Sequence, residues 1–199
     1  MLDATINKSA FTTYELVLIA MCAAVTCILA PISVPLAGEV PISLCTFAVM
    51  LAAVLLGARD GALSQLIYVL LGSAGLPVFA GWTGGLGIVM GVTGGYIIGY
   101  IPMAFVTGLI YDKFGRNARG AAKILTMVLS MLAGTAVLYV LGTAWFIAQT
   151  HMTLAASMAA CVIPFLPGDM LKIAAVAIAA PPIEAAVRRI VPEKMDSFR

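Results

Sequence analysis

The chain has 199 residues, of which 62% are hydrophobic and 10% charged, and its mean hydropathy is +1.09. Soluble domains carry roughly 45–50% apolar and about 25% charged residues, so this composition excludes an ordinary soluble domain and predicts an integral membrane protein. The formal net charge is only +2 and the charges are scattered along the chain, which argues against a nucleic-acid-binding surface.

The N-terminal third contains two apolar stretches that predict the first two transmembrane helices, since about 20 apolar residues cross a bilayer. The first runs from Leu16 to Gly38, and Tyr14 and Glu15 precede it rather than a basic segment. We therefore expect a retained helix and not a cleaved signal peptide. A short loop with Glu39 follows, and Ile42 to Ala58 is the second span.

No charged residue lies between Gly61 and Tyr111, and this stretch is too long for one crossing. Its middle part, Gly72 to Gly99, is rich in glycine, which predicts that a glycine-rich loop joins the third and fourth spans. The third span ends near Ala74 and is short for a full crossing, so we expect the loop to dip into the membrane.

The last third predicts two more spans, one from about Ala121 to Ala148 and one from Pro167 to near Arg188. Proline suits the first turn of a helix, which supports the second of these starts. The stretch between them, Thr150 to Phe165, is apolar but short, and we interpret it as a re-entrant or surface helix. A full crossing there would give seven spans and place Arg188 outside.

The positions of the basic residues favour six spans, because cytoplasmic loops carry an excess of lysine and arginine. With six, all but Lys172 fall on one side: Lys8, Arg59, Lys113, Arg116, Arg119, Lys123, Arg188, Arg189, Lys194 and Arg199. We predict one all-α integral membrane domain over residues 1–199 with six transmembrane helices and an outer glycine-rich loop between the third and fourth. Residues 1–13 and the C-terminal tail 190–199 are both expected to be cytoplasmic.

The last span begins with Asp169 and Lys172, the two charged residues that we expect at membrane depth. Charges within a membrane are costly and usually functional, and a spacing of three residues places both on one helical face. One interpretation is an ion pair that closes the helix start, with Asp169 at the positive end of the helix dipole. We favour a solute site, because a lysine in the first turn opposes that dipole.

The glycine-rich loop contains a small repeat, G-x-T-G-G, which begins at Gly81 and again at Gly91. Glycine allows unusual backbone angles, and irregular backbone at membrane depth is tolerated where it lines a cavity. Three aromatic residues would give such a cavity an apolar wall: Phe79, Trp82 and Tyr96. The alternative is that these aromatics are interfacial and that Gly95 and Gly99 serve helix packing.

Catalytic and metal-binding patterns are absent from the sequence, which contains no P-loop, HExxH or GxSxG motif. The four cysteines match no zinc-ligand pattern and are interpreted as apolar filler: Cys22, Cys27, Cys45 and Cys161. We therefore predict no enzyme, no metal and no cofactor. Ala20 and Ala24 form an Ala-x-x-x-Ala pair that would let another helix approach closely.

Four segments resemble the BioY family, the biotin-binding S components of energy-coupling factor (ECF) transporters. They are Leu55–Gly61, Tyr68–Gly81, Thr93–Tyr96 and Pro164–Lys172. The resemblance implies that Asp169 and Lys172 address the ureido ring of biotin, with Lys172 meeting either the ureido carbonyl or the valerate carboxylate. It implies further loop and pocket positions: Phe79, Gly84, Gly85, Thr93 and Tyr96.

The resemblance also implies the partners and the location of the protein. Ala20 and Ala24 match the face on which such S components dock the transmembrane coupling subunit, which is paired with ATPase subunits. We accordingly expect high-affinity biotin capture in the cell membrane of a prokaryote, with biotin bound as substrate, membrane lipid as surroundings and no nucleic acid as partner.

Two departures from the family pattern affect the expected pocket: Val92 stands where many members have proline, and Cys45 where many have glutamine. The second removes an amide, so the resemblance does not support pocket contacts from the second helix, including Thr46. Three alternatives stay open: an S component for another vitamin or small solute, a membrane enzyme that uses Asp169, and a stand-alone gradient-driven transporter. The last would call for inverted repeats or coupling-ion carboxylates, and we find neither.

Overall fold

The computed structural model describes residues 12–34 and 42–190, so the predicted Glu39 loop lies outside the described residues. The long helices are α1 (Thr13–Leu29), α2 (Cys45–Leu56), α3 (Ala58–Ser73), α5 (Gly94–Ile110), α6 (Gly120–Thr150) and α8 (Leu166–Ile190). The shorter elements are α4 (Leu86–Val89), α7 (Leu154–Cys161), the π-helical turn η1 (Tyr111–Gly115) and the 3₁₀ turn η2 (Ile163–Phe165). The strands of this part, β1 (Ser33–Val34) and β2 (Ile42–Ser43), form one small antiparallel pair.

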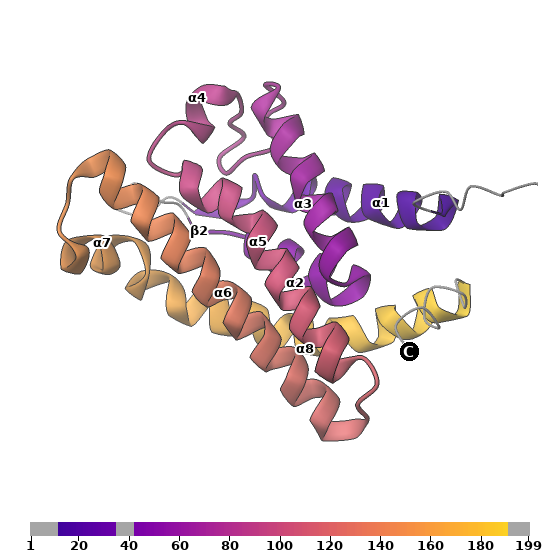
Figure 1. Cartoon of the computed structure of the whole chain (residues 1–199). Coiled ribbons are helices and arrows are strands. Elements are labelled where there is room, and N and C mark those ends of the chain that lie inside the picture. Colours follow the sequence, from indigo (N-terminus) through magenta and orange to yellow (C-terminus); the bar gives the residue numbers. More distant parts are fainter. Residues whose placement is uncertain (1–11, 35–41, 191–199) are drawn as a thin grey trace, which may run out of the picture.

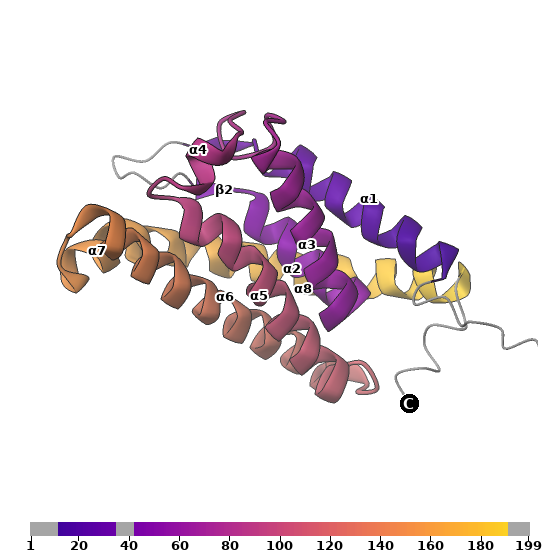
Figure 2. The same ribbon diagram turned by 45° about the horizontal axis from the view of Figure 1, so that its top comes forward.

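The long helices form one bundle in which α2 is the most enclosed (Figures 1 and 2). Helix α5 packs against α6, α3 and α2, while α8 runs along α2 and α6 on the far side in Figure 1. Val49, Met50 and Ala53 of α2 have no exposed surface. The predicted helical architecture is therefore confirmed for the described residues, apart from the short β1–β2 pair.

Length and composition qualify three helical stretches of the described residues as membrane spans: Gly94–Gly115, Gly120–Thr150 and Leu154–Val187. The other three long helices are shorter, with 17 residues in α1, 12 in α2 and 16 in α3. The shortness of α3 was predicted, whereas α2 ends two residues before the expected Ala58. Gly57 ends it there with φ +84°, a left-handed conformation that glycine adopts without strain.

The glycine-rich stretch joins α3 to α5, as predicted, and includes the short helix α4. Backbone hydrogen bonds fix it to its neighbours, from the Gly81 amide to the Pro31 carbonyl (3.2 Å) and from Gly85 to Gly72 (2.7 Å). The indole N–H of Trp145 on α6 donates to the Gly91 carbonyl over 2.9 Å. The loop is thus attached to three parts of the bundle.

Close packing of α5 on α6 depends on glycine at several positions. A methyl group added at Gly95 would run into the Trp145 side chain, and one added at Gly99 would press on Leu138. Gly142 of α6 lies directly against the Tyr96 ring. The structure therefore supports the helix-packing interpretation of the Gly95 and Gly99 pair.

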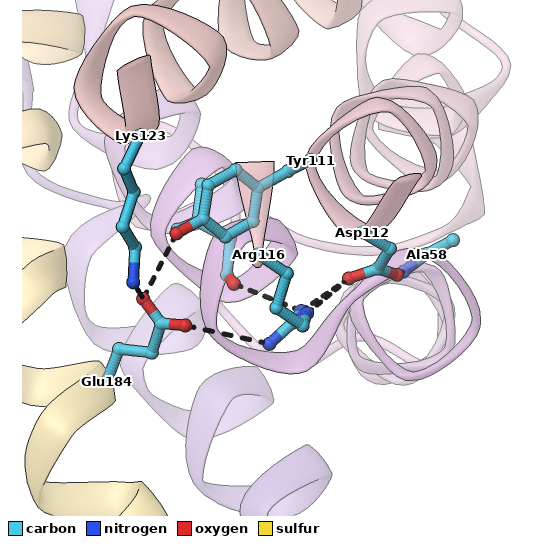
Figure 3. Close-up of polar contacts among 7 residues, drawn as sticks. Ala58, Tyr111, Asp112, Arg116, Lys123 and Glu184 are labelled. Carbon is cyan, nitrogen blue, oxygen red and sulfur yellow. Dashed lines mark hydrogen bonds and ion pairs between the residues drawn. The ribbon is translucent and has the colours of Figure 1, made fainter. Parts of the chain in front are cut away.

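A buried ionic network joins α8 to the turn between α5 and α6 (Figure 3). We call it the Glu184 network, and its members are Tyr111, Asp112, Arg116, Lys123 and Glu184. The Glu184 carboxylate is 3% exposed, pairs with Lys123 at 2.7 Å and accepts from the Tyr111 hydroxyl at 3.0 Å. Arg116 lies 4.0 Å from Glu184 and donates from Nε to Asp112 over 2.7 Å.

Asp112 also accepts from the Ala58 amide (2.9 Å), so the network satisfies the first turn of α3 as well. Asp169 and Lys172 are the two charges that the sequence predicts at membrane depth, and the structure adds Glu184 as a further buried charge. Its charge is tolerated because Lys123 and Arg116 surround it.

Candidate solute-binding site

Asp169 and Lys172 both lie at the start of α8 and face the interior of the bundle. Their side chains are buried, with 2% of Asp169 and 8% of Lys172 exposed. The ammonium group of Lys172 donates to Asp169 Oδ1 over 3.0 Å, as the spacing of three residues predicts. The two charged groups therefore form a buried ion pair.

Thr46, in the first turn of α2, completes a triangle with this pair. Its hydroxyl donates to Asp169 Oδ1 (3.2 Å) and accepts from Lys172 Nζ (2.9 Å). The family resemblance gives no support for pocket contacts from the second helix, whereas in the structure Thr46 contacts the pair and lines the small cavity beside it. The loss of an amide at Cys45 does not affect the hydroxyl of the next residue, which reaches the pair by itself.

Tyr139 of α6 supplies the remaining contact, because its hydroxyl donates to Asp169 Oδ2. Donors from α2, α6 and α8 thus converge on one buried carboxylate, and we call Thr46, Tyr139, Asp169 and Lys172 the Asp169 cluster. Three donors on one carboxylate hold it in a fixed orientation. Sequence patterns did not reveal Thr46 or Tyr139, since neither lies near Asp169 in the chain.

The Asp169 cluster lies beside a small cavity of about 40 Å³. A larger cavity of about 310 Å³ adjoins it, and the two share the side chains of Ser43, Tyr96 and Tyr100 as walls. The larger one extends toward the glycine-rich loop and is walled by aromatic and small residues, among them Tyr68, Phe79, Gly87, Gly91 and Thr93. The site is thus polar at one end and mostly apolar at the other, as small-molecule sites usually are.

Three of the predicted loop residues line the larger cavity: Phe79, Thr93 and Tyr96. The Phe79 ring is buried and stands edge-on to Tyr68, with ring centroids 5.6 Å apart. The Tyr96 hydroxyl lies 3.0 Å from that of Thr143, which fixes the ring between the two cavities. Trp82 lies outside both cavity walls and is 67% exposed.

Gly84 and Gly85 do not line either cavity, although the resemblance assigned them to the loop and pocket. A side chain at Gly84 would collide with the Leu76 carbonyl, and Gly85 has φ +100°. Their role in the structure is to let the loop fold closely over the end of α3. The two departures from the family pattern, Cys45 and Val92, both contribute to the wall of the larger cavity.

The arrangement offers a hydrogen-bond acceptor and a donor that can recognise a polar group. Within residues 12–34 and 42–190, no group of histidine, cysteine, aspartate or glutamate side chains could hold a metal ion. Asp169 supplies an acceptor next to the donor of Lys172, so the cluster fits a compact group that presents N–H and C=O side by side.

Comparison with known proteins identifies the family. Residues 5–189 match the model of the BioY family. The chain belongs to the BioY family. It is 38% identical over 166 residues to a probable biotin transporter BioY of Pyrococcus horikoshii, a match that covers 83% of this chain and 93% of that protein. It is 39% identical over 149 residues to the biotin transporter BioY of Rhodobacter capsulatus, covering 71% and 77%.

Among solved structures, this BioY-family chain is similar to the S component for biotin from an ECF-type ABC transporter. The TM-score is 0.79 at 26% sequence identity, and the match covers 90% of this chain and 95% of that one. The family resemblance predicted from the sequence is thereby confirmed, as is the prediction of a transport protein rather than an enzyme.

The predicted docking pair, Ala20 and Ala24, lies on the exposed side of α1. Large apolar side chains surround it on the same face, including Leu16, Met21 and Ile28, of which Ile28 is 64% exposed. Nothing in the described part of the chain covers this face, so it is available to lipid or to another helix.

Proposed function

We propose that this protein is the high-affinity biotin-binding S component of an ECF transporter. It captures biotin and delivers it to a complex of the transmembrane coupling subunit with its ATPases. The observation that carries the proposal is the buried Asp169 cluster next to a cavity of about 310 Å³, in a chain of the BioY family. The names of the relatives and of the similar structure support it.

Biotin matches the two ends of the site chemically. Its ureido ring has N–H donors for Asp169 and a C=O acceptor for Lys172, and a buried ureido group needs such partners to offset its desolvation. Its thioether ring and valeryl chain are mostly apolar and suit walls made by Phe79, Tyr96 and Tyr100. We therefore place the ureido ring at the Asp169 cluster and the rest of the molecule under the glycine-rich loop.

The proposal includes the membrane arrangement predicted above. Helices α1, α2, α3, α5, α6 and α8 make six spans in the cell membrane of a prokaryote, with residues 1–13 and 190–199 in the cytoplasm. The short helix α2 is covered by the other helices over most of its length, so lipid need not match it, whereas α3 exposes Leu66, Leu70 and Leu71 on one face. Ala20 and Ala24 dock the coupling subunit, and lipid covers the remaining apolar surface.

Biotin binding by the purified protein tests the function. We expect saturable binding by the wild type, weakened roughly 10- to 100-fold in Asp169→Asn and in Lys172→Ala, because each loses a charged hydrogen bond in a buried site. Lys113→Ala is the control, since this exposed lysine lies at the turn between α5 and α6. A wild type without saturable binding overturns the function; normal binding by both site variants overturns the site.

A second titration decides which end of biotin Lys172 meets. Biotin methyl ester keeps the ureido ring but lacks the valerate charge. If Lys172 addresses the ureido carbonyl, Lys172→Ala lowers the affinities for biotin and for the ester by the same factor. If Lys172 addresses the carboxylate, the wild type prefers biotin strongly and Lys172→Ala loses that preference.

A further inference from the structure

Tyr139 lines two separate hollows of the structure, the small cavity and a surface groove. Its hydroxyl donates to Asp169 Oδ2 inside the small cavity. Its ring also lines an apolar groove of about 300 Å³ between α6 and α7, together with Val140, Ile147 and Met158. Tyr139 therefore separates the buried carboxylate from an apolar surface that faces away from the site.

The other contacts of Asp169 fix only one oxygen of its carboxylate. Thr46 and Lys172 both donate to Oδ1, so neither fixes the position of the second oxygen. Tyr139 alone among the described residues is recorded as a donor to Oδ2, and it comes from a third helix. Because the phenol of Tyr139 contacts Oδ2, both oxygens of the carboxylate have donors and its plane is fixed.

We propose that Tyr139 is a positioning residue that sets the specificity of the site by orienting Asp169 toward a ligand N–H. The proposal rests on the function proposed above. One lone pair of Oδ2 is used by the phenol, so the acceptor sites left on the carboxylate point into the cavity in a fixed direction. A cyclic urea with an N–H next to its C=O fits the acceptor of Asp169 and the donor of Lys172 together.

The variant Tyr139→Phe removes this contact alone, because it keeps the ring that closes the groove. We expect biotin affinity to fall roughly tenfold, since a buried carboxylate loses one of its three donors. Tyr111→Phe is the matched control: it removes a hydroxyl that donates to a carboxylate of the same helix, Glu184, over 3.0 Å. Affinity within twofold of the wild type is expected for the control, and an equal loss in both variants overturns the proposal.

A double-mutant cycle separates positioning from direct contact with biotin. If Tyr139 acts through Asp169, then Tyr139→Phe has little further effect in an Asp169→Asn background, titrated to millimolar biotin. Should that background bind no biotin at all, Asp169→Glu replaces it, and the effect of Tyr139→Phe is again expected to shrink. A tenfold loss that persists in either background shows that the phenol meets biotin itself and overturns the proposal.

Biotin binding by the wild type and by Tyr139→Phe also separates the positioning role of Tyr139 from the proposed function. Absence of biotin binding by the wild type removes the function and this inference with it. Normal binding by the wild type together with unchanged affinity in Tyr139→Phe removes the positioning role only, and leaves the biotin site in place.

Discussion

Lys172 and Thr46 stand 126 residues apart in the sequence, yet the lysine ammonium group donates to the threonine hydroxyl over 2.9 Å. Because this hydroxyl also donates to Asp169, the threonine joins acceptor and donor into one unit. The start of α2 thereby belongs to the Asp169 cluster.

Replacing Thr46 with valine tests the importance of these two hydrogen bonds. The change keeps the shape of the side chain but removes both hydrogen bonds, so we expect biotin affinity to fall roughly tenfold in equilibrium titrations. Thr135→Val serves as the control, because among the described residues that hydroxyl bonds to Met131 of its own helix (2.8 Å) and to none of the Asp169 cluster. If Thr46→Val binds biotin with wild-type affinity, then Asp169 and Lys172 bind biotin without help from the threonine.

The Glu184 network is expected to govern stability and not binding. Glu184→Gln leaves Lys123 without its buried counter-charge and removes one of the two carboxylates next to Arg116, which costs about 3 kcal/mol and lowers Tm by about 6–12 °C in a chain of this length. Thermal unfolding of the detergent-solubilised protein measures this shift. Lys113→Met is the control: this lysine is exposed, so we expect its replacement to leave Tm unchanged. Biotin affinity within twofold of the wild type is expected in both variants, and a Tm equal to that of the wild type in Glu184→Gln contradicts the role.

Gly95→Ala tests the packing of α5 on α6. The added methyl group displaces Trp145, which also holds the glycine-rich loop through Gly91. Overpacking costs about 1–3 kcal/mol, so Tm is expected to fall by several degrees. Faster dissociation of biotin should accompany this fall, because the loop loses an attachment. Gly168→Ala, where a methyl group meets no neighbour, is expected to behave like the wild type in both measurements.

The docking face is tested by adding bulk to α1. Leucine at both Ala20 and Ala24 prevents the close approach of another helix, so we expect the double variant to bind biotin normally but to lose co-purification with the coupling subunit and the ATPases. Ala136→Leu places the same bulk on the exposed side of α6 and should assemble normally. Undiminished assembly of the double variant would place the docking surface elsewhere.

Much of this fold and part of the site could be predicted from the sequence. Asp169 and Lys172 were found because a charge within an apolar stretch is conspicuous and a spacing of three residues fixes a shared face. The glycine-rich connection was found because glycine clusters between apolar runs. In each case a local pattern carried the information.

The contacts that local patterns missed depend on tertiary structure. Thr46 and Tyr139 are ordinary polar residues in apolar helices, and only the packing of α2 and α6 against α8 brings them to the carboxylate. Glu184 is an acidic residue inside an apolar helix, two residues after Pro182, and this position could have indicated burial. It lies near the helix end, however, where a charge is usually solvated. Its burial follows from the Lys123 and Arg116 contacts.

Helix α8 contributes to two buried charged clusters, the Asp169 cluster near its beginning and the Glu184 network near its end, and the two have no residue in common. Selectivity and robustness are therefore separable traits in this chain. Substitutions around the cavities can change the accepted solute while the ionic network preserves the scaffold, which makes the half of the bundle around the Asp169 cluster the natural starting point for engineering new cargo.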